Sequence, residues 1–246
     1  PLTVVTGEVG TGKTTLVQAL LRHVDADFTV GLLSNAQGER GELLRWVLSA
    51  LDIPSSQSDD YVTLFEKFQD FAIEEYAAGR CVLLIIDEAQ NLSFESLEEL
   101  RMLTNINSNK DEVLQLVLLG QPELRYKITA PELRQFAQRV TATYHLEPMD
   151  LNTARQYMRH RLEHVGGTGH EISPQAMRLI HETSQGIPRM INKICDLALV
   201  YTASAGHKAV SVTTVKELIR DGVILPTRPL PLYLTNPVEL PEKAAE

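Results

Sequence analysis

The feature that most constrains the fold is a glycine-rich stretch, GEVGTGKT at residues 7–14, near the start of the 246-residue chain. It matches the pattern G-x-x-x-x-G-K-[ST] at every position. The apolar run at 2–6 predicts a β-strand before it, and the spacing of apolar residues in 13–24 predicts a helix after it. A tight turn between a strand and a helix needs residues that accept positive φ angles, and the glycines supply them.

A loop of this kind binds phosphate groups, because its backbone N–H groups turn inward and form a nest for anions. The positive end of the following helix adds to the attraction. Lys13 is placed to reach the β- and γ-phosphates of a nucleotide, and Thr14 to hold Mg²⁺. The nucleotide-binding residues predicted from this motif are Gly7, Glu8, Val9, Gly10, Thr11, Gly12, Lys13, Thr14 and Thr15.

Apolar runs and helical patterns alternate through the first part of the chain. Strands are predicted at 2–6, 28–33, 81–87, 112–120 and 141–146. Helices are predicted at 13–24, 41–52, 61–78 and 94–106. Because strands separated by helices favour a parallel sheet, we expect residues 1–148 to form an α/β domain with a parallel five-stranded sheet, of the P-loop NTPase class.

The pattern changes near residue 148, and beyond it the spacing predicts helices alone. These helices are expected at 152–165, 174–184, 188–205 and 212–221. The chain is therefore expected to continue into a small all-α domain over residues 149–222. Residues 223–246 are rich in proline, which predicts a linker or an extended arm rather than a folded unit.

Composition narrows the classes of protein. A net charge of −9 argues against a broad, non-specific contact with nucleic acid or with an anionic membrane. No apolar run reaches the length of about 18 residues that a membrane span needs, and no signal peptide is visible. Because the chain begins with Pro1 and not with Met, directly at a predicted strand, we expect it to be a fragment of a longer protein.

Two acidic residues follow the most apolar of the predicted strands. Asp87 is expected at the strand end beside the phosphate loop, where it can hold the water shell of Mg²⁺. Glu88 can polarise a water molecule for attack on the γ-phosphate. A kinase acting on a small molecule has no use for this second carboxylate, because its nucleophile is the substrate itself. The alternative, two acids that cap the following loop, is the weaker interpretation.

Four further residues are candidates for contacts with the γ-phosphate. Gln121 follows another central strand and can orient the attacking water, although it is also a suitable turn residue before a proline. Arg139 precedes the last predicted strand and can face the nucleotide of a neighbouring subunit; a surface arginine is the alternative. Arg134 is a weaker candidate for the same role. Arg189, at the start of a helix in the second domain, can report nucleotide state to that domain.

Other side chains with distinctive chemistry have simpler explanations. Cys81 and Cys195 are far apart in apolar runs and are expected to be buried free thiols. His160 and His164 have the spacing of a zinc-binding pair on a helix. No third ligand is evident near them in the sequence, so a solvated helix face is the better interpretation.

The chain resembles the AAA+ ATPases in a set of residues and in their order. In that superfamily the phosphate loop at 7–14, the Asp87-Glu88 pair, Gln121, Arg139 and Arg189 correspond to Walker A, Walker B, sensor 1, the arginine finger and sensor 2. The chain resembles more closely the bacterial ATPases of the general secretion pathway protein A type. Related chains act in exosortase, exopolysaccharide and transposition systems. The resemblance spans about residues 2–220 and is carried by TGEVGTGKTTL, IIDEAQNL, LVLLGQPEL, QRV, YMRHRLEHVG and SQGIPRMINKICDLAL.

The resemblance implies that ATP and Mg²⁺ bind between the α/β domain and a helical lid. Glu88 would act as base, Lys13 and Mg²⁺ would stabilise charge, and Arg139 would act in trans. Lid rotation through Arg189 would convert nucleotide state into motion. It implies a homo-oligomer, either a ring, a filament or at least a dimer. It also implies a place in the cytoplasm or at the cytoplasmic face of the inner membrane, and a membrane-associated secretion or envelope partner.

Two other functions remain open at this stage. One is a DNA-associated ATPase of the transposition type, against which the acidic balance argues mildly. The other is a nucleotide switch or scaffold that does not hydrolyse ATP. Family members also carry a segment before the first strand that helps to hold the adenine, and they often continue into a membrane segment and a peptidoglycan-binding part. Neither feature can be read in this chain.

Overall fold

The computed structural model describes residues 2–34, 42–108 and 111–224. Its contacts divide the chain into two compact units, with the division between Glu147 and Pro148. Each unit is described separately. From residue 225 on, the predicted proline-rich tail at 223–246 lies outside the described residues.

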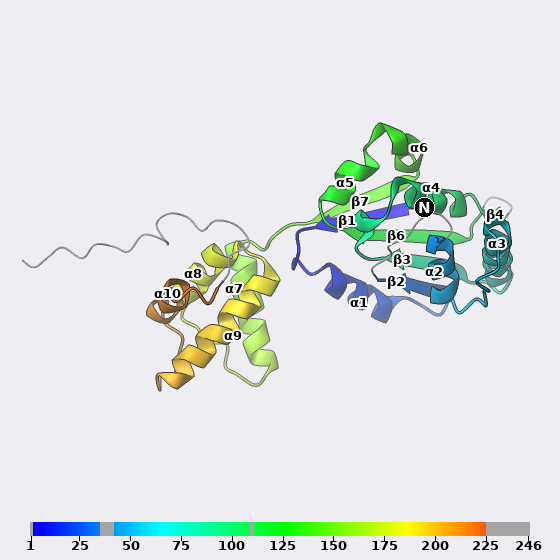
Figure 1. Ribbon diagram of the computed structural model, residues 1–246. Helices are drawn as coiled ribbons and strands as arrows, with labels where there is room; N and C mark the ends of the chain where they lie inside the picture. The colour runs from blue at the N-terminus through cyan, green and yellow to red at the C-terminus, as the bar shows by residue number, and fades with distance from the viewer. Residues whose placement is uncertain (1, 35–41, 109–110, 225–246) are drawn as a thin grey trace, which may run out of the picture. The chain divides into compact units, whose positions relative to one another are not determined.

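The first unit is built on the parallel five-stranded sheet that the sequence predicts (Figure 1). Its strands are β1 (Leu2–Gly7), β2 (Phe28–Leu33), β3 (Cys81–Ile86), β6 (Leu114–Gly120) and β7 (Val140–Leu146). They lie in the order β2-β3-β6-β1-β7, and every neighbouring pair is parallel. The expectation of an α/β fold with this sheet is confirmed.

The connections between these strands are mostly helical, as expected for a parallel sheet. The longer helices are α1 (Lys13–His23), α2 (Glu42–Ala50), α3 (Tyr61–Ala77) and α4 (Phe94–Leu103). The shorter elements are η1 (Ala89–Asn91), β4 (Asn107–Ser108), β5 (Asp111–Glu112), α5 (Glu123–Ile128), η2 (Pro131–Leu133) and α6 (Arg134–Ala137). The sequence predicted none of the short elements, because they are too brief to show a repeating apolar pattern.

Side chains of β3 alternate between two apolar cores, one on each face of the sheet. Val82, Leu84 and Ile86 belong to the larger core, to which α2 through α6 contribute. Leu83 and Ile85 belong to a smaller core that includes α1. Because successive residues of a strand point to opposite faces, burial on both faces requires the continuous apolar run seen in the sequence.

The second unit consists of α7 (Leu151–His164), α8 (Pro174–Ser184), α9 (Pro188–Ser204) and α10 (Val212–Arg220). Asp150, Ser173 and Ser211 each cap the start of a helix by accepting a hydrogen bond from a backbone N–H three residues on. The helices enclose their own apolar core. Within the described residues, no helix is both long and apolar enough to cross a membrane.

A buried carboxylate ties α3 to the edge strand β2. Glu75 is 8% exposed and accepts hydrogen bonds from Arg80, from Nε at 2.7 Å and from Nη2 at 2.6 Å. The hydroxyl of Thr29 also donates to it. The bonds from Arg80, which outweigh the opposing effect of burial, and the bond from Thr29 lower the pKa of Glu75 from 4.5 to about 2.

The substitution Glu75→Gln tests this link. We expect it to lower the free energy of unfolding by about 1–2 kcal/mol at pH 7, because the charged hydrogen bonds are lost. A carboxylate with a depressed pKa gives its full stabilisation above its unfolded pKa of 4.5 and loses it as the pH falls through about 2. The stability gap to wild type in urea titrations should therefore shrink between these pH values.

Glu74→Gln is the matched control, because Glu74 precedes Glu75 on the same helix and is exposed. It should change stability by less than about 0.5 kcal/mol. A gap between wild type and Glu75→Gln that stays the same from pH 7 to pH 2 would contradict the role of the charged pair.

Candidate functional site

The loop after β1 has the backbone shape that the glycine pattern predicts. Gly10 and Gly12 have φ angles of 86° and 107°. The hydroxyl of Thr11 donates to the carbonyl of Glu8 at 2.8 Å and closes the turn. A Cβ added at Gly7 would lie 2.7 Å from that hydroxyl oxygen, so a side chain cannot be placed there without moving the loop. The loop is therefore a compact cradle followed directly by the start of α1.

Lys13 lies inside this cradle and is 7% exposed. Its Nζ donates to the carbonyl oxygens of Gly7 at 2.7 Å and of Glu8 at 3.2 Å. Burial lowers the pKa of Lys13, and the nearby carboxylates of Glu88 and Asp87 oppose this effect. A buried ammonium whose hydrogen bonds go to neutral carbonyls is well suited to meet an incoming anion, so the cradle fits the phosphates of a nucleotide.

Thr14 and Asp87 face each other at the edge of the cradle. The hydroxyl of Thr14 donates to Oδ2 of Asp87 at 3.5 Å. The backbone N–H of Asp87 donates to Leu33 at 2.8 Å, which fixes the end of β3 against β2. These are hard oxygen ligands, and Mg²⁺ is commonly held by one or two carboxylates together with substrate phosphates. The pair therefore fits a magnesium ion that arrives with a nucleotide.

Glu88 stands in a backbone conformation that is rare outside glycine, with a φ angle of 55°. Its N–H donates to Oδ1 of Asp87 at 2.9 Å. Its Oε2 accepts hydrogen bonds from Nε2 of Gln90 at 2.5 Å and from Nε2 of Gln121 at 3.5 Å. Non-glycine residues in such conformations cluster at functional sites. The structure thus brings the predicted residues Asp87, Glu88 and Gln121 together.

Gln90 is a member of this site that the sequence reasoning missed. Its Oε1 accepts a hydrogen bond from the backbone N–H of Gln121 at 3.0 Å. Nothing in the apolar pattern marks this residue. The available signal was its position two residues after Glu88, within the DEAQ run that follows a buried strand.

Arg139 is exposed, and its guanidinium donates to the side chain of Asn105. It precedes β7, whose first residue, Val140, pairs with Leu2 at the start of β1. The phosphate loop follows the other end of β1. Seven residues of strand separate the two ends, which is about 20 Å. The structure therefore does not bring Arg139 to the phosphate loop of its own chain. Arg134, five residues earlier on α6, is also exposed.

The remaining candidates lie in the second unit. Arg189 is exposed in the first turn of α9. The rings of His160 and His164 are 6.2 Å apart on α7, and both side chains are exposed. Across residues 2–34, 42–108 and 111–224, no group of three or more histidine, cysteine or acidic side chains is placed to hold a metal. Neither Cys81, on β3 of the first unit, nor Cys195, on α9, forms a disulfide within the described residues, and both are half-buried rather than fully buried as expected. Burial raises the pKa of Cys195 to about 12.

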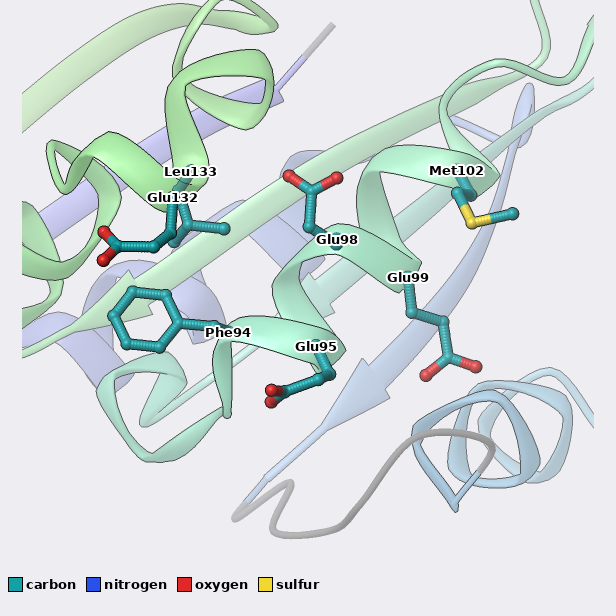
Figure 2. Close-up of a pocket in the computed structure, with 7 residues that line it drawn as sticks. All are labelled: Phe94, Glu95, Glu98, Glu99, Met102, Glu132 and Leu133. Atoms are coloured by element: carbon teal, nitrogen blue, oxygen red, sulfur yellow. The ribbon is translucent and has the colours of Figure 1, made fainter.

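A separate hollow of about 540 Å³ lies between α4 and η2 (Figure 2). Its lining residues are Phe94, Glu95, Glu98, Glu99, Met102, Glu132 and Leu133. Carboxylates repel phosphate groups, so this acidic hollow is not an alternative place for the phosphates of a nucleotide. None of the predicted site residues belongs to it.

Two glycine substitutions test the shape of the loop. Gly12→Ala and Gly79→Ala both place a Cβ at a positive φ angle where it meets no atom within 4 Å. Each should cost about 1 kcal/mol of stability through backbone strain. Only Gly12 belongs to the cradle, so only Gly12→Ala should weaken nucleotide binding, by about tenfold in fluorescence titrations with an ATP analogue. Equal affinities for the two variants would contradict this role.

A family model described as an AAA domain matches residues 1–128. General secretion pathway protein A from Aeromonas hydrophila is 39% identical to the chain over 206 residues, which are 83% of this chain and 38% of that protein. The chain thus spans well under half the length of this relative.

Solved structures with the same fold include the ORC2 protein of Aeropyrum pernix, with a TM-score of 0.66 and 17% identity over 89% of this chain and 61% of that one. Cdc6p from Pyrobaculum aerophilum has a TM-score of 0.66 and 16% identity over 90% and 60% of the two chains. Domain III of DnaA from Thermotoga maritima has a TM-score of 0.58 and 21% identity over 89% and 83%. At these identities the likeness concerns the fold alone.

The match of the family model covers more than half of the chain and includes β1, the phosphate loop, Asp87, Glu88 and Gln121. The family match and the geometry of the cradle both indicate nucleotide binding. The chain therefore belongs to the AAA domain family of ATPases and, within it, resembles general secretion pathway protein A.

Proposed function

We propose that the chain hydrolyses Mg-ATP and uses the reaction to drive conformational change in a bacterial secretion, export or cell-envelope assembly system. The observation that supports hydrolysis is the position of the Glu88 carboxylate, which accepts a hydrogen bond from Gln121 and lies beside the Thr14–Asp87 pair. The name of the relative from Aeromonas hydrophila supports the secretion part. The chain spans 38% of that relative, so the role of the whole protein rests on this likeness.

The residues of the cradle would bind and orient the nucleotide. Lys13 would exchange its carbonyl partners for phosphate oxygens, and Thr14 with Asp87 would hold Mg²⁺. Mg²⁺, when bound, supplies positive charge to the β- and γ-phosphates. Glu88 would accept the proton of the attacking water, and Gln121 would orient that water or meet the γ-phosphate. Such a set positions reactants and neutralises charge, which is what phosphoryl transfer mainly requires.

Arg139 would complete the site of a neighbouring subunit. Its place at the amino end of β7, about 20 Å along the sheet from the phosphate loop, supports a role in trans over one in cis. We accordingly propose a homo-oligomer. The second unit, residues 149–222, would act as a lid, with Arg189 responding to the nucleotide. We propose that the reaction takes place in the cytoplasm or at the cytoplasmic face of the inner membrane, with a membrane-associated partner for the whole protein.

Glu88→Gln tests hydrolysis directly. The amide keeps the size of the side chain but cannot accept the proton, so kcat for ATP should fall on the order of 10²- to 10⁴-fold while ATP affinity is retained. Phosphate release gives kcat, and equilibrium titration gives the affinity. Glu132→Gln, an exposed glutamate outside the site, is the control and should leave both unchanged. Equal, near-zero rates for wild type and Glu88→Gln would instead indicate a nucleotide switch or scaffold.

Mixing two inactive variants tests the arginine in trans. Arg139→Ala should lower kcat by about 10³-fold, as expected for loss of an arginine finger, and Lys13→Ala should abolish productive nucleotide binding. In a mixed oligomer, a Lys13→Ala subunit still offers Arg139 to the intact cradle of its neighbour. The mixture should therefore recover activity that neither variant has alone.

Arg125→Ala, an exposed arginine on α5, is the control for Arg139→Ala and should retain wild-type turnover. If the mixture of the two inactive variants stays inactive although size measurements show mixed oligomers, Arg139 does not act across a subunit boundary.

A further inference from the structure

The side-chain amide of Gln90 joins the two loops that carry the proposed catalytic groups. Its nitrogen donates to Oε2 of Glu88 at 2.5 Å, on the loop after β3. Its oxygen accepts from the backbone N–H of Gln121 at 3.0 Å, at the start of the loop after β6. The amide of Gln90 thus supplies a donor and an acceptor at the same time. Neither a carboxylate nor an apolar side chain of this size can do both.

The surroundings hold this amide in place from both sides. A Cβ added at Gly120 would lie 2.9 Å from Oε1 of Gln90, so the absence of a side chain at Gly120 makes room for the amide. Lys127 of α5 donates from Nζ to the carbonyl oxygens of Gln90 and Leu92, both at 2.7 Å. The backbone of η1 and the side chain of Gln90 are therefore both anchored to the segment that follows β6.

Glu88 depends on these contacts for its orientation. A glutamate side chain has three rotatable bonds and loses much freedom when it is held. Both hydrogen bonds to its carboxylate within the described residues go to Oε2, one from Gln90 and one from Gln121. One oxygen is thus restrained by two amides, while Oε1 is left to meet a water molecule. Displacement of a reacting group by about 1 Å can cost on the order of 10²-fold in rate.

We propose that Gln90 is a positioning residue that locks Glu88 and Gln121 into one unit, so that the base and the amide that orients the water are placed together. This inference rests on the proposed ATP hydrolysis. Gln90 acts through its two neighbours and makes no contact with the reacting atoms itself. The unit would move as one body when nucleotide binds, because each loop holds the other.

Two variants separate the two ends of the amide. Gln90→Leu removes both hydrogen bonds at nearly constant size. Gln90→Glu keeps an acceptor for the N–H of Gln121 but loses the donor to Glu88. We expect kcat for ATP to fall about 10- to 100-fold in both variants, while the Kd for ATP, measured by titration, stays near the wild-type value. Asn91→Ala, which truncates the exposed amide one residue on, is the matched control and should keep wild-type kcat.

Hydrogen exchange at the backbone N–H of Gln121, read by NMR, gives a measure that needs no turnover. Its protection should be lost in Gln90→Leu and kept in Gln90→Glu. Unchanged kcat in both variants would overturn the inference, as would a rise in Kd that parallels the loss of rate or an equal loss in Asn91→Ala. A wild-type protein that hydrolyses no ATP would overturn the proposed function and the positioning role together, and the exchange data would then describe a purely structural bridge.

Discussion

Parallel pairing of β3, β6 and β1 is the constraint on which the rest of the site depends. Thr6 pairs with Gly120, and Ile86 pairs with Leu118, so the three strands end close together at one edge of the sheet. The phosphate loop, the Asp87-Glu88 pair and Gln121 each follow one of these strand ends. Thr14 and Asp87, 73 positions apart in sequence, thus reach hydrogen-bond distance without any long connection having to fold around a ligand. Apolar burial on both faces holds the strands and thereby the site.

The cradle holds a charge that it does not fully neutralise. Burial lowers the pKa of Lys13, although Glu88 and Asp87 work in the opposite direction. The protein thus keeps an ammonium among carbonyl oxygens, where its desolvation is a cost. A bound polyphosphate would offset that cost. It would also bind most strongly to a cation that has already lost most of its water. The buried ammonium therefore lowers the stability of the nucleotide-free site while it raises the affinity of the site for anions, a trade-off that is common at functional sites.

Much of this arrangement could be predicted from the sequence, because it rests on local patterns. The continuous apolar run at 81–87 and the glycines at 7–12 each depend on neighbouring residues alone, and both predictions agree with the structure in β3 and in the loop. The position of Gln90 was not predictable in this way, since its partners include a backbone N–H 31 residues away. Nor could the anchor from Lys127 be foreseen, because α5 is too short to show a helical pattern. The roles of Arg139 and Arg189 stay predictions.

The position of Arg139 has a consequence for assembly. An arginine at the amino end of β7 and a phosphate cradle at the carboxyl end of β1 form two unlike surfaces on one subunit. Contacts that join such surfaces run head to tail, and they close into a ring or continue as a filament. In the proposed homo-oligomer, an open assembly would always leave one cradle without an arginine and one arginine without a cradle. Turnover per subunit would then rise with the number of subunits and level off on closure, so that assembly itself would act as the switch for the enzyme.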